Sequence, residues 1–452
     1  MTDTAEVMRM WLVGGVLISA LVVPRTASAG LEHINDRFGA VIAGDGDRVA
    51  VAAPGDNGGA VDGGAVYVYV RDGDGWVLED RVVAAEPIAK AEIGSALALS
   101  GDTLAVALPF QYGEPGSVLV FERGGDGWRQ VARVTSDVED DLFGAAIALS
   151  GDVLAVATGP RVVDEMAAPG QVHVFHAGAG WDRVAALQGS SGAGFDYGCT
   201  PKLALKDDLL ACIVPTQEWE THGASLGSRI AVFVRDGDAW RPGGDIVEAP
   251  EFGFADIAFD GTRMITRALE LIEIEGGYDA ETSVRAYLRD DDGWSLGRKV
   301  HDLGHDYPYD GTFALAGPWL AFDSFDDGPK VTLLHREDDE WKLAVTLPGG
   351  DMDHNGEYSR ALALATGTLW IGDPAAPSRD MTAIEPRPDV PEAVISVGSV
   401  RVHALSGEFA EEARFDPEYP GERSGCRIDA QGNGAWVWLV LPMLVLGRRR
   451  RT

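Results

Sequence analysis

The chain has 452 residues, 46% of them apolar, with 57 Gly and 23 Pro, a composition that suits a large core and many tight turns. This composition therefore excludes an intrinsically disordered chain. The formal net charge is -34, from 71 acidic against 37 basic residues, and it disfavours nucleic acid and anionic membrane surfaces as partners. A solvated acidic surface accounts for this charge without any electrostatic docking role.

The N-terminus has the features of an export signal. Residues 11–23 form an apolar run, and Ala27-Ser28-Ala29 supplies the small residues that signal peptidase accepts. We therefore predict that residues 1–29 are a signal peptide and that the mature chain begins at Gly30.

One repeated unit fills most of the remaining chain. It consists of a strand that ends in Gly-Asp or a similar turn, followed by a β-hairpin that closes on Asp-Gly-Trp or a related sequence. The hairpins with a Trp lie at residues 66–76, 118–128, 172–181, 230–240, 284–294 and 331–341. A seventh hairpin begins at residues 400–405, with Phe409 in the place of Trp.

Each unit divides into four short strands, as judged from alternating polarity and short apolar runs. Four antiparallel strands repeated about every 50 residues are typical of a β-propeller blade. The sequence therefore predicts an all-β, seven-bladed β-propeller of four-stranded antiparallel blades over residues 30–416. Asp-Gly before each Trp suits a tight hairpin, because Gly accepts a positive φ at no steric cost.

These motifs resemble FG-GAP repeats, the units of the integrin α-chain propeller and of many exported bacterial proteins. The resemblance is clearest at Phe38-Gly39 and Ala53-Pro54. Many FG-GAP units carry a calcium loop between their first two strands, but this chain has short turns there, such as Gly46-Asp47 and Gly101-Asp102. These turns have too few oxygens for calcium, which takes six to eight ligands.

Two segments contain residue types found in metal sites. The stretch from Asp351 to Asn355 matches the start of a calcium loop, but Ser359 occupies the usual acidic ninth position, so a polar loop between blades is the better explanation. His301 and His305 are four residues apart in a segment that we predict to be a loop, where that spacing places no two ligands on one face. We therefore predict no metal site and no cofactor.

Two of the three cysteines, Cys199 and Cys212, flank a predicted hairpin turn at residues 206–208. Disulfides fit an exported protein, and the two sulfurs could meet across adjacent strands. We predict a disulfide between them; the alternative is two separate buried thiols.

The third cysteine, Cys426, begins a C-terminal segment with a polar spacer, an apolar run at residues 435–446 and arginines at 448–451. The run is shorter than the roughly 20 residues of a spanning helix. The segment resembles the C-terminal sorting signals of myxobacterial surface proteins. That resemblance implies transient membrane insertion, processing and anchoring at Cys426, and display at the cell surface or outer membrane. Residues 417–425 would then be a linker and 426–452 the signal. The alternative is a short tail that keeps the protein on the periplasmic side of the inner membrane.

No catalytic motif is recognisable, neither a Gly-x-Ser-x-Gly elbow nor a His-Glu-x-x-His helix, and we predict no catalytic residue. The preferred function is a non-catalytic, surface-anchored binding or adhesion module for an extracellular protein or glycan. Loops on rigid scaffolds commonly carry binding, and four long segments suit display: 56–64, 161–169, 217–227 and 374–392. The alternatives are an extracellular hydrolase on a propeller scaffold and a periplasmic assembly factor.

Overall fold

The fold is that of a computed structural model. The residues it describes are 36–57, 59–73, 75–108, 116–136, 142–158, 161–163, 166–168, 170–188, 202–215, 228–237, 239–244, 246–247, 252–274, 277–290, 293–304, 312–324, 330–348, 361–373, 399–405 and 411–415. The predicted signal peptide, the linker and the sorting signal with Cys426 lie outside these ranges, and so does Cys199.

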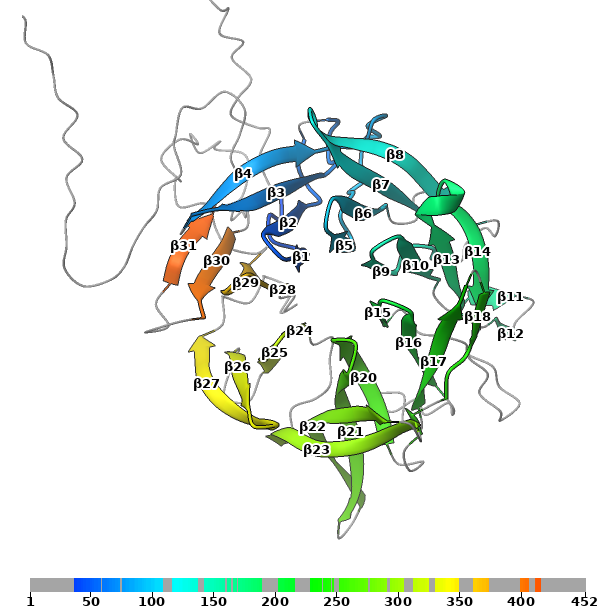
Figure 1. The fold of residues 1–452 in the computed structure, drawn as a ribbon, viewed down its shortest axis with the longest axis vertical. Coiled ribbons are helices and arrows are strands. Elements are labelled where there is room, and N and C mark those ends of the chain that lie inside the picture. The colour runs from blue at the N-terminus through cyan, green and yellow to red at the C-terminus, as the bar shows by residue number, and fades with distance from the viewer. Residues whose placement is uncertain are drawn as a thin grey trace, which may run out of the picture.

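The chain forms a ring of seven blades, each an antiparallel sheet whose strands follow one another in sequence from the centre outward (Figure 1). This arrangement confirms the predicted seven-bladed, four-stranded architecture.

Blade 1 contains β1 (Ile42–Asp45), β2 (Arg48–Ala53), β3 (Ala65–Asp72) and β4 (Gly75–Val82). Blade 2 contains β5 (Leu97–Ser100), β6 (Thr103–Leu108), β7 (Ser117–Gly124) and β8 (Gly127–Thr135). Blade 3 contains β9 (Ala146–Ser150), β10 (Val153–Ala157), β13 (Val172–His176) and β14 (Asp182–Leu187). Blade 4 contains β15 (Leu203–Lys206), β16 (Leu209–Pro215), β17 (Ser228–Asp236) and an outer strand in two pieces, β18 (Ala239–Pro242) and β19 (Ile246–Val247).

Blade 5 contains β20 (Phe252–Phe259), β21 (Arg263–Ile274), β22 (Gly277–Asp290) and β23 (Gly293–Gly304). Blade 6 contains β24 (Phe313–Ala316), β25 (Trp319–Ser324), β26 (Lys330–Glu337) and β27 (Glu340–Pro348). Blade 7 contains β28 (Leu362–Ala365), β29 (Thr368–Asp373), β30 (Ser399–Ala404) and β31 (Glu411–Phe415). A small hairpin of β11 (Arg161–Val163) and β12 (Met166–Ala168) and a short 3-10 helix, η1 (Ala177–Ala179), are additions to blade 3.

The repeated hairpins lie where the sequence predicts them. Five of the six tryptophans lie at the start of an outermost strand, and Trp181 directly precedes β14. In blade 1, Gly73 has a φ of +60° in the turn before Trp76. The Arg71 guanidinium stacks over the Trp76 ring at 5.5 Å, and Arg336 stacks over Trp341 at 5.8 Å in blade 6. The Arg and Trp that flank the turn therefore hold the hairpin together from both sides.

A β-bulge recurs in the outermost strand. The pairing shifts at the same place in blades 1, 2, 3, 6 and 7, between the fourth and fifth residues of the third strand, counted so that Ala65 is the first in blade 1. In blade 1 the extra residue is Glu79, which lies between Leu78 and Asp80, the partners of Tyr69 and Val68. Bulges increase the local twist and redirect a side chain, and here the bulge directs Glu79 toward blade 2.

The core is divided among the interfaces between blades. Small residues allow the innermost strands to approach: a Cβ on Gly44 of blade 1 would lie 3.2 Å from that of Ala365 in blade 7. A Cβ on Gly94, whose φ is +103°, would lie 2.8 Å from that of Ala52. The Gly of the Phe-Gly-like motif in blade 2 is therefore required both by its backbone conformation and by the close approach of blade 1.

Within the described residues, blades 1 and 7 share no strand, and they meet through side-chain packing and a hydrogen bond from the Thr366 amide to the Gly46 carbonyl at 3.0 Å. Trp370 of blade 7 is fully buried against Trp76 of blade 1, with ring centroids 5.0 Å apart and nearly perpendicular planes. Phe38 and Tyr67 extend the same apolar cluster. The side chains at this seam therefore help to close the ring.

Blade 5 differs most from the predicted plan. Its strands are the longest, and β20 carries a bulge between Phe254 and Asp256. His301 and Asp302 lie within β23, so the prediction that they belong to a loop is wrong. The extended hairpin of blade 5 makes β23 longer than the outermost strands of the other blades. The strand therefore continues through His301, beyond the end that the repeat pattern predicts.

Candidate functional site

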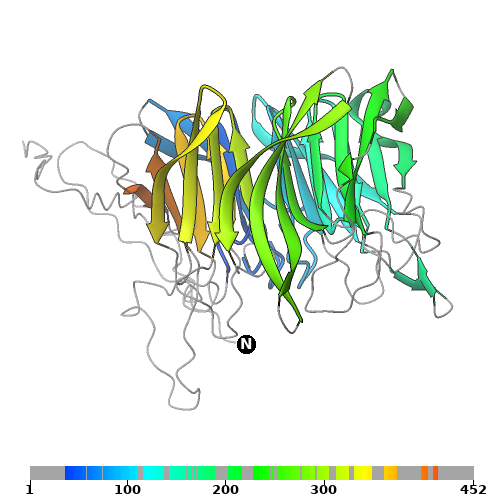
Figure 2. The same ribbon diagram turned by 90° about the horizontal axis from the view of Figure 1, so that it is seen from below.

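The two flat sides of the ring carry different connections. One side, the short-turn face, holds the turns between the first and second strands and between the third and fourth strands of each blade. The other side, the long-connection face, holds the second-to-third connections and the links between blades. Of the four segments predicted to display ligands, 56–64 and the described parts of 161–169 join a second strand to a third and so belong to the long-connection face. Segments 217–227 and 374–392 lie outside the described residues. The β11–β12 hairpin and the ends of β21 and β22 project from the same side (Figure 2).

The short-turn face uses its polar groups to join neighbouring blades. The last residue of an innermost strand accepts a hydrogen bond from the turn of the next blade: Asp45 from the Gly101 amide at 2.7 Å and Ser100 from the Gly151 amide at 3.0 Å. Ser150 does the same for the Asp207 amide at 2.9 Å. The short turns therefore help to join neighbouring blades.

Glu79 forms another link between blades 1 and 2. Its carboxylate accepts hydrogen bonds from Arg48 at 3.1 Å, from Arg123 of blade 2 at 2.6 Å and from the Trp128 indole at 3.0 Å. Burial alone would raise the pKa of Glu79, but these hydrogen bonds outweigh it and lower the pKa.

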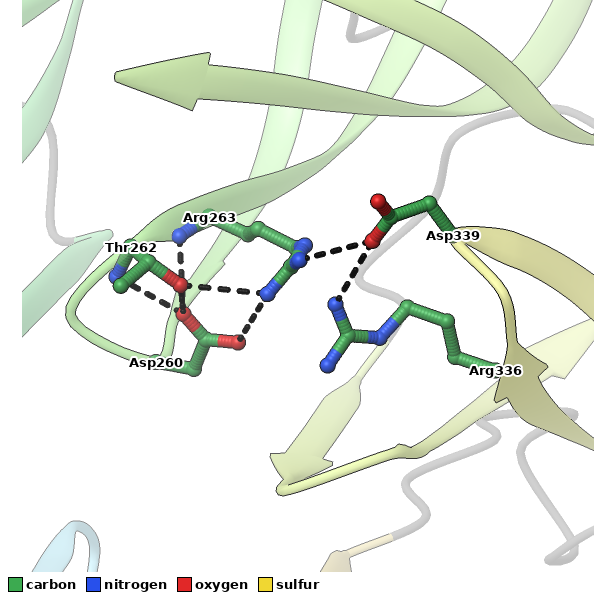
Figure 3. A network of polar contacts seen from close by, with 5 residues as sticks. All are labelled: Asp260, Thr262, Arg263, Arg336 and Asp339. Atoms are coloured by element: carbon green, nitrogen blue, oxygen red, sulfur yellow. Dashed lines mark hydrogen bonds and ion pairs between the residues drawn. The ribbon is translucent and has the colours of Figure 1, made fainter. Parts of the chain in front are cut away.

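A similar network joins blades 5 and 6 (Figure 3). Arg263 donates to Asp339 at 3.0 Å, and Arg336 approaches the same oxygen at 3.5 Å. Asp260 accepts the backbone amides of Thr262 and Arg263, each at 2.8 Å. Asp339 is 82% exposed, so water screens the outer part of this network.

On the long-connection face, the loop at 56–64 is fixed to the link between blades 1 and 2. The Lys90 amide donates to the Val61 carbonyl at 2.7 Å, and the Glu92 amide donates to the Asp62 carbonyl at 3.0 Å. The side chains of Val61 and Ile88 remain 64% and 46% exposed. The two segments form a ledge with apolar side chains facing solvent.

Below this ledge a buried polar cluster stabilises blade 1. The Tyr67 hydroxyl donates to Asp56 at 2.6 Å, and Arg81 forms an ion pair with the other Asp56 oxygen. Burial, followed by the Asp56 charge, raises the pKa of Tyr67. Burial alone would lower the pKa of Arg81, but Asp56 reverses that effect and raises it. Arg81 is therefore neutralised within its own blade.

A cavity of about 310 Å³ opens beside the ledge, between blades 1 and 2. Its apolar lining comes from Ile88, Leu108, Leu119 and three alanines, and its polar lining comes from Glu86, Gln130 and Arg133. This volume lies at the lower end of the range for small-ligand pockets.

Arg133 occupies the same place in blade 2 as Arg81 does in blade 1. Arg133 is paired with Leu119 across the outer strands, as Arg81 is paired with Tyr67. Its Nε donates to the Ser117 hydroxyl at 3.1 Å, and within the part of the chain that the structure describes no carboxylate forms an ion pair with it. Arg133 is exposed at the cavity and retains guanidinium N–H groups for a ligand.

A second unusual region lies where the innermost strands begin on the long-connection face. The first position there, the entry position, is apolar in blades 1, 2, 3 and 7: Val41, Ala96, Ala146 and Ala361. In blades 4, 5 and 6 it is occupied by Lys202, Asp256 and Thr312.

The residue opposite the entry position on the second strand divides the blades in a similar way, except for blade 4. Blades 1, 2, 3 and 7 have small residues there, whereas blades 5 and 6 have charged ones. The small residues are Ala52, Ala107, Ala157 and Gly372. Blade 4 has Ile213, blade 5 has Arg267 and blade 6 has Asp323.

Arg267 and Asp323 form a buried ion pair across the interface of blades 5 and 6. Both side chains are at most 1% exposed, and Arg267 Nη2 donates to the Asp323 carboxylate at 2.9 Å and to its backbone carbonyl at 2.7 Å. The remaining groups, Nε and Nη1, are buried without a hydrogen-bond partner. The guanidinium lies over the Phe313 ring at 5.7 Å.

Asp256 lies beside this pair and is 8% exposed. Burial raises its pKa, while the positive charges of Lys202 and Arg267 and the Ile257 amide oppose the shift. On β23, the outermost strand of blade 5, burial lowers the pKa of His301. The entry region of blades 4 to 6 is therefore a buried polar cluster within an otherwise apolar ring.

The predicted site residues are only partly placed by the structure. Cys212 is fully buried in β16 and is disulfide-bonded, but Cys199 lies outside the described residues, so the pairing of the two stays a prediction. Cys426 and the segment from Asp351 to Asn355 also lie outside. Within the described ranges, no group of three or more His, Cys, Asp or Glu side chains could hold a metal ion, and no helix is long and apolar enough to span a membrane.

Sequence reasoning missed Asp256, Arg267, Asp323 and Arg133. A position-by-position alignment of the seven units would have found the first three, because charged residues replace alanine there in only some blades. Arg133 would still have been missed. It stands out only because no described carboxylate forms an ion pair with it and because a cavity lies beside it.

Comparisons with known proteins find similarity among solved structures alone. No protein-family model matches the sequence, and no curated protein matches it. Among solved structures, a protein from Lactobacillus plantarum is 12% identical, with a TM-score of 0.47, covering 81% of this chain and 95% of its own. The β-propeller domain of the Trilobed protease from Pyrococcus furiosus is 9% identical, with a TM-score of 0.43, covering 81% and 94%. The N-terminal domain of Nup159 is 8% identical, with a TM-score of 0.40, covering 76% and 91%.

Proposed function

We propose that the protein is a non-catalytic binding module that contacts an extracellular protein or glycan through its long-connection face. The observation that carries this proposal is that the long second-to-third connections described in blades 1 and 3 belong to the face that also holds the apolar ledge and the cavity with Arg133. The short-turn face, in contrast, uses many of its polar groups to join blades. A rigid ring would therefore hold one variable face toward a partner.

We also propose that the blades are FG-GAP-like and that the chain is exported and anchored at the cell surface. The Phe-Gly motifs at Phe38-Gly39 and Phe143-Gly144 support the first part. The apolar run at 11–23, and Cys426 with the arginines after it, support the second. Intact mass and terminal peptides of the protein from its native host test the anchoring: a form that starts at Gly30 and ends near a modified Cys426 is expected. A form that retains Arg448 would place the protein at the inner membrane.

Binding through one face is tested with matched surface substitutions. The full chain, purified in mild detergent, is assayed on intact cells of the native host and on a glycan array. Val61→Asp and Ile88→Asp change exposed apolar residues of the ledge, and we expect them to reduce binding at least fivefold. Val77→Asp and Leu343→Asp make the same change at residues that are 43% and 59% exposed on outermost strands, and they serve as controls. Equal binding by all four variants would contradict the proposal.

The competing function, an extracellular hydrolase, is favoured by one observation, the buried Asp256 with its raised pKa beside Arg267. Perturbed carboxylates are frequent in active sites, and they are also found in structural ion clusters. The Asp256→Asn variant distinguishes an active site from a structural ion cluster. Loss of a measured glycosidase, esterase or peptidase activity with a retained melting temperature would favour the hydrolase.

A further inference from the structure

The cavity between blades 1 and 2 has a polar and apolar lining that points to a particular ligand. We propose that it binds the C-terminal residue of a partner polypeptide, with the terminal carboxylate at Arg133 and an apolar side chain in the cavity. This inference rests on the proposed function, since it names the partner chemistry for the long-connection face.

The carboxylate site consists of Arg133 and Gln130. Arg133 is an exposed cation for which no described carboxylate is an ion-pair partner, in a chain whose formal charge is -34. The Gln130 Oε1 accepts the Ala85 amide at 2.9 Å, and this bond leaves the NH2 group of the amide to donate. A guanidinium and an amide N–H on one side of a cavity suit a carboxylate.

The apolar part of the ligand has a matching surface. Leu108 and Leu119 are 7% and 3% exposed at the floor of the cavity, and Ile88 forms its edge. The volume of about 310 Å³ admits a single residue of the size of leucine or phenylalanine together with its carboxylate.

A chain end fits this arrangement better than an internal residue. Asp and Glu carry their carboxylate on the side chain and so have no apolar side chain left for the floor, whereas a C-terminal Leu presents both groups. Glu86, which also lines the cavity, can accept an N–H of the bound main chain. The exposed side chains of Val61 and Ile88 continue from the cavity along the ledge, where the preceding residues of the peptide would lie.

Blade 1 shows what a structural arginine at this position looks like. Arg81 is partly buried and is held by Asp56 and the Tyr67 hydroxyl. Arg133 lacks such a partner among the described residues and faces the cavity instead. The same strand position is therefore part of the blade in one repeat and open to a ligand in the next.

The test uses the full chain in mild detergent and a fluorescein-labelled hexapeptide, Gly-Ser-Gly-Ser-Ala-Leu, with a free or an amidated C-terminus. We expect the free acid to bind at least tenfold more tightly than the amide by fluorescence polarisation. Arg133→Ala should weaken binding of the acid at least tenfold and leave the amide unchanged. Arg129→Ala removes the same charge from an exposed position on the same strand, β8, and should have no such effect.

Three outcomes would overturn the inference. One is equal binding of acid and amide, and another is unchanged binding by the Arg133→Ala variant with a wild-type melting temperature. The third is that N-acetyl-leucine competes with an affinity equal to that of the peptide, which would make this a site for small apolar acids. If the peptide shows no dependence on its carboxylate while Val61→Asp still abolishes binding to cells, the inference fails and the proposed function stands.

Discussion

Blades 1 to 3 and blades 4 to 6 follow one strand plan but fill the same inner positions with different chemistry. Ala52, Ala107 and Ala157 occupy the second-strand position in the first group, and Arg267 and Asp323 occupy it in blades 5 and 6. Because the blades with alanine form the same sheets, the ion pair is not needed to build a blade. Buried ion pairs are weak evidence for stability, and they remain strongly sensitive to the loss of one partner.

The largest effect is expected from breaking that pair. Asp323→Ala leaves the Arg267 guanidinium buried without its counter-charge, and we expect the free energy of unfolding to fall by about 3–5 kcal/mol in urea denaturation. The control is Asp102→Ala, which removes a carboxylate that is 64% exposed in a surface pair and should cost less than about 1 kcal/mol.

The double variant Arg267→Ala with Asp323→Ala sharpens the comparison, since it installs the alanines of blades 1 to 3. We expect it to be more stable than Asp323→Ala alone, because no uncompensated charge remains. A double variant that is less stable than either single variant would show that the two halves of the ring are not interchangeable at this position.

An intermediate effect is expected for Glu79→Gln, in the link between blades 1 and 2. Hydrogen bonds to charged groups contribute about 1.5–3 kcal/mol, so a loss of that order is expected at neutral pH. Because folding lowers the pKa of Glu79, its contribution is present above the pKa of the unfolded chain and is lost as the pH falls through the lower folded value. Urea denaturation at several pH values should therefore show the two proteins converging in acid. A constant difference at every pH would contradict this account.

The smallest effect is expected at the hydrogen bonds from the innermost strands. Ser100→Ala removes a bond between blades 2 and 3, and Ser150→Ala removes its counterpart between blades 3 and 4. Both sites are near the surface, so each substitution should cost about 0.5–1 kcal/mol, measured as a small decrease in melting temperature. Because the hydrogen bond is the same on both sides of blade 3, the two substitutions should lower the melting temperature by similar amounts. A large difference would mean that the distinct chemistry of blades 4 to 6 extends to the short-turn face.

The architecture could be predicted from the sequence because it depends on short-range signals. A Gly with positive φ such as Gly73, followed by Trp76, specifies a hairpin within a few residues, and seven such units specify the ring. The predicted display segment 56–64 and the described parts of 161–169 also proved to lie between second and third strands. That they share one face follows from the order of strands in each blade, which became clear only with the pairing.

The site could be predicted only in part, because its groups meet through register and through contacts between blades. Arg267 and Asp323 are 56 residues apart, and neither stands in a recognisable motif. The bulge that directs Glu79 to Trp128 adds one residue to a strand without any Gly or Pro to mark it. His301 was assigned to a loop because blade 5 is longer than its neighbours, and a repeat pattern gives no warning of such an extension.

The seam between blades 1 and 7 has a consequence for how the gene could be rearranged. Every blade is built from consecutive strands, and the first and last blades meet through side chains such as Trp76 and Trp370. New ends could therefore be opened in the link between any two blades, with the old ends joined, and each sheet would still be encoded in one piece. A circular permutation would move the seam around the ring without dividing a single blade.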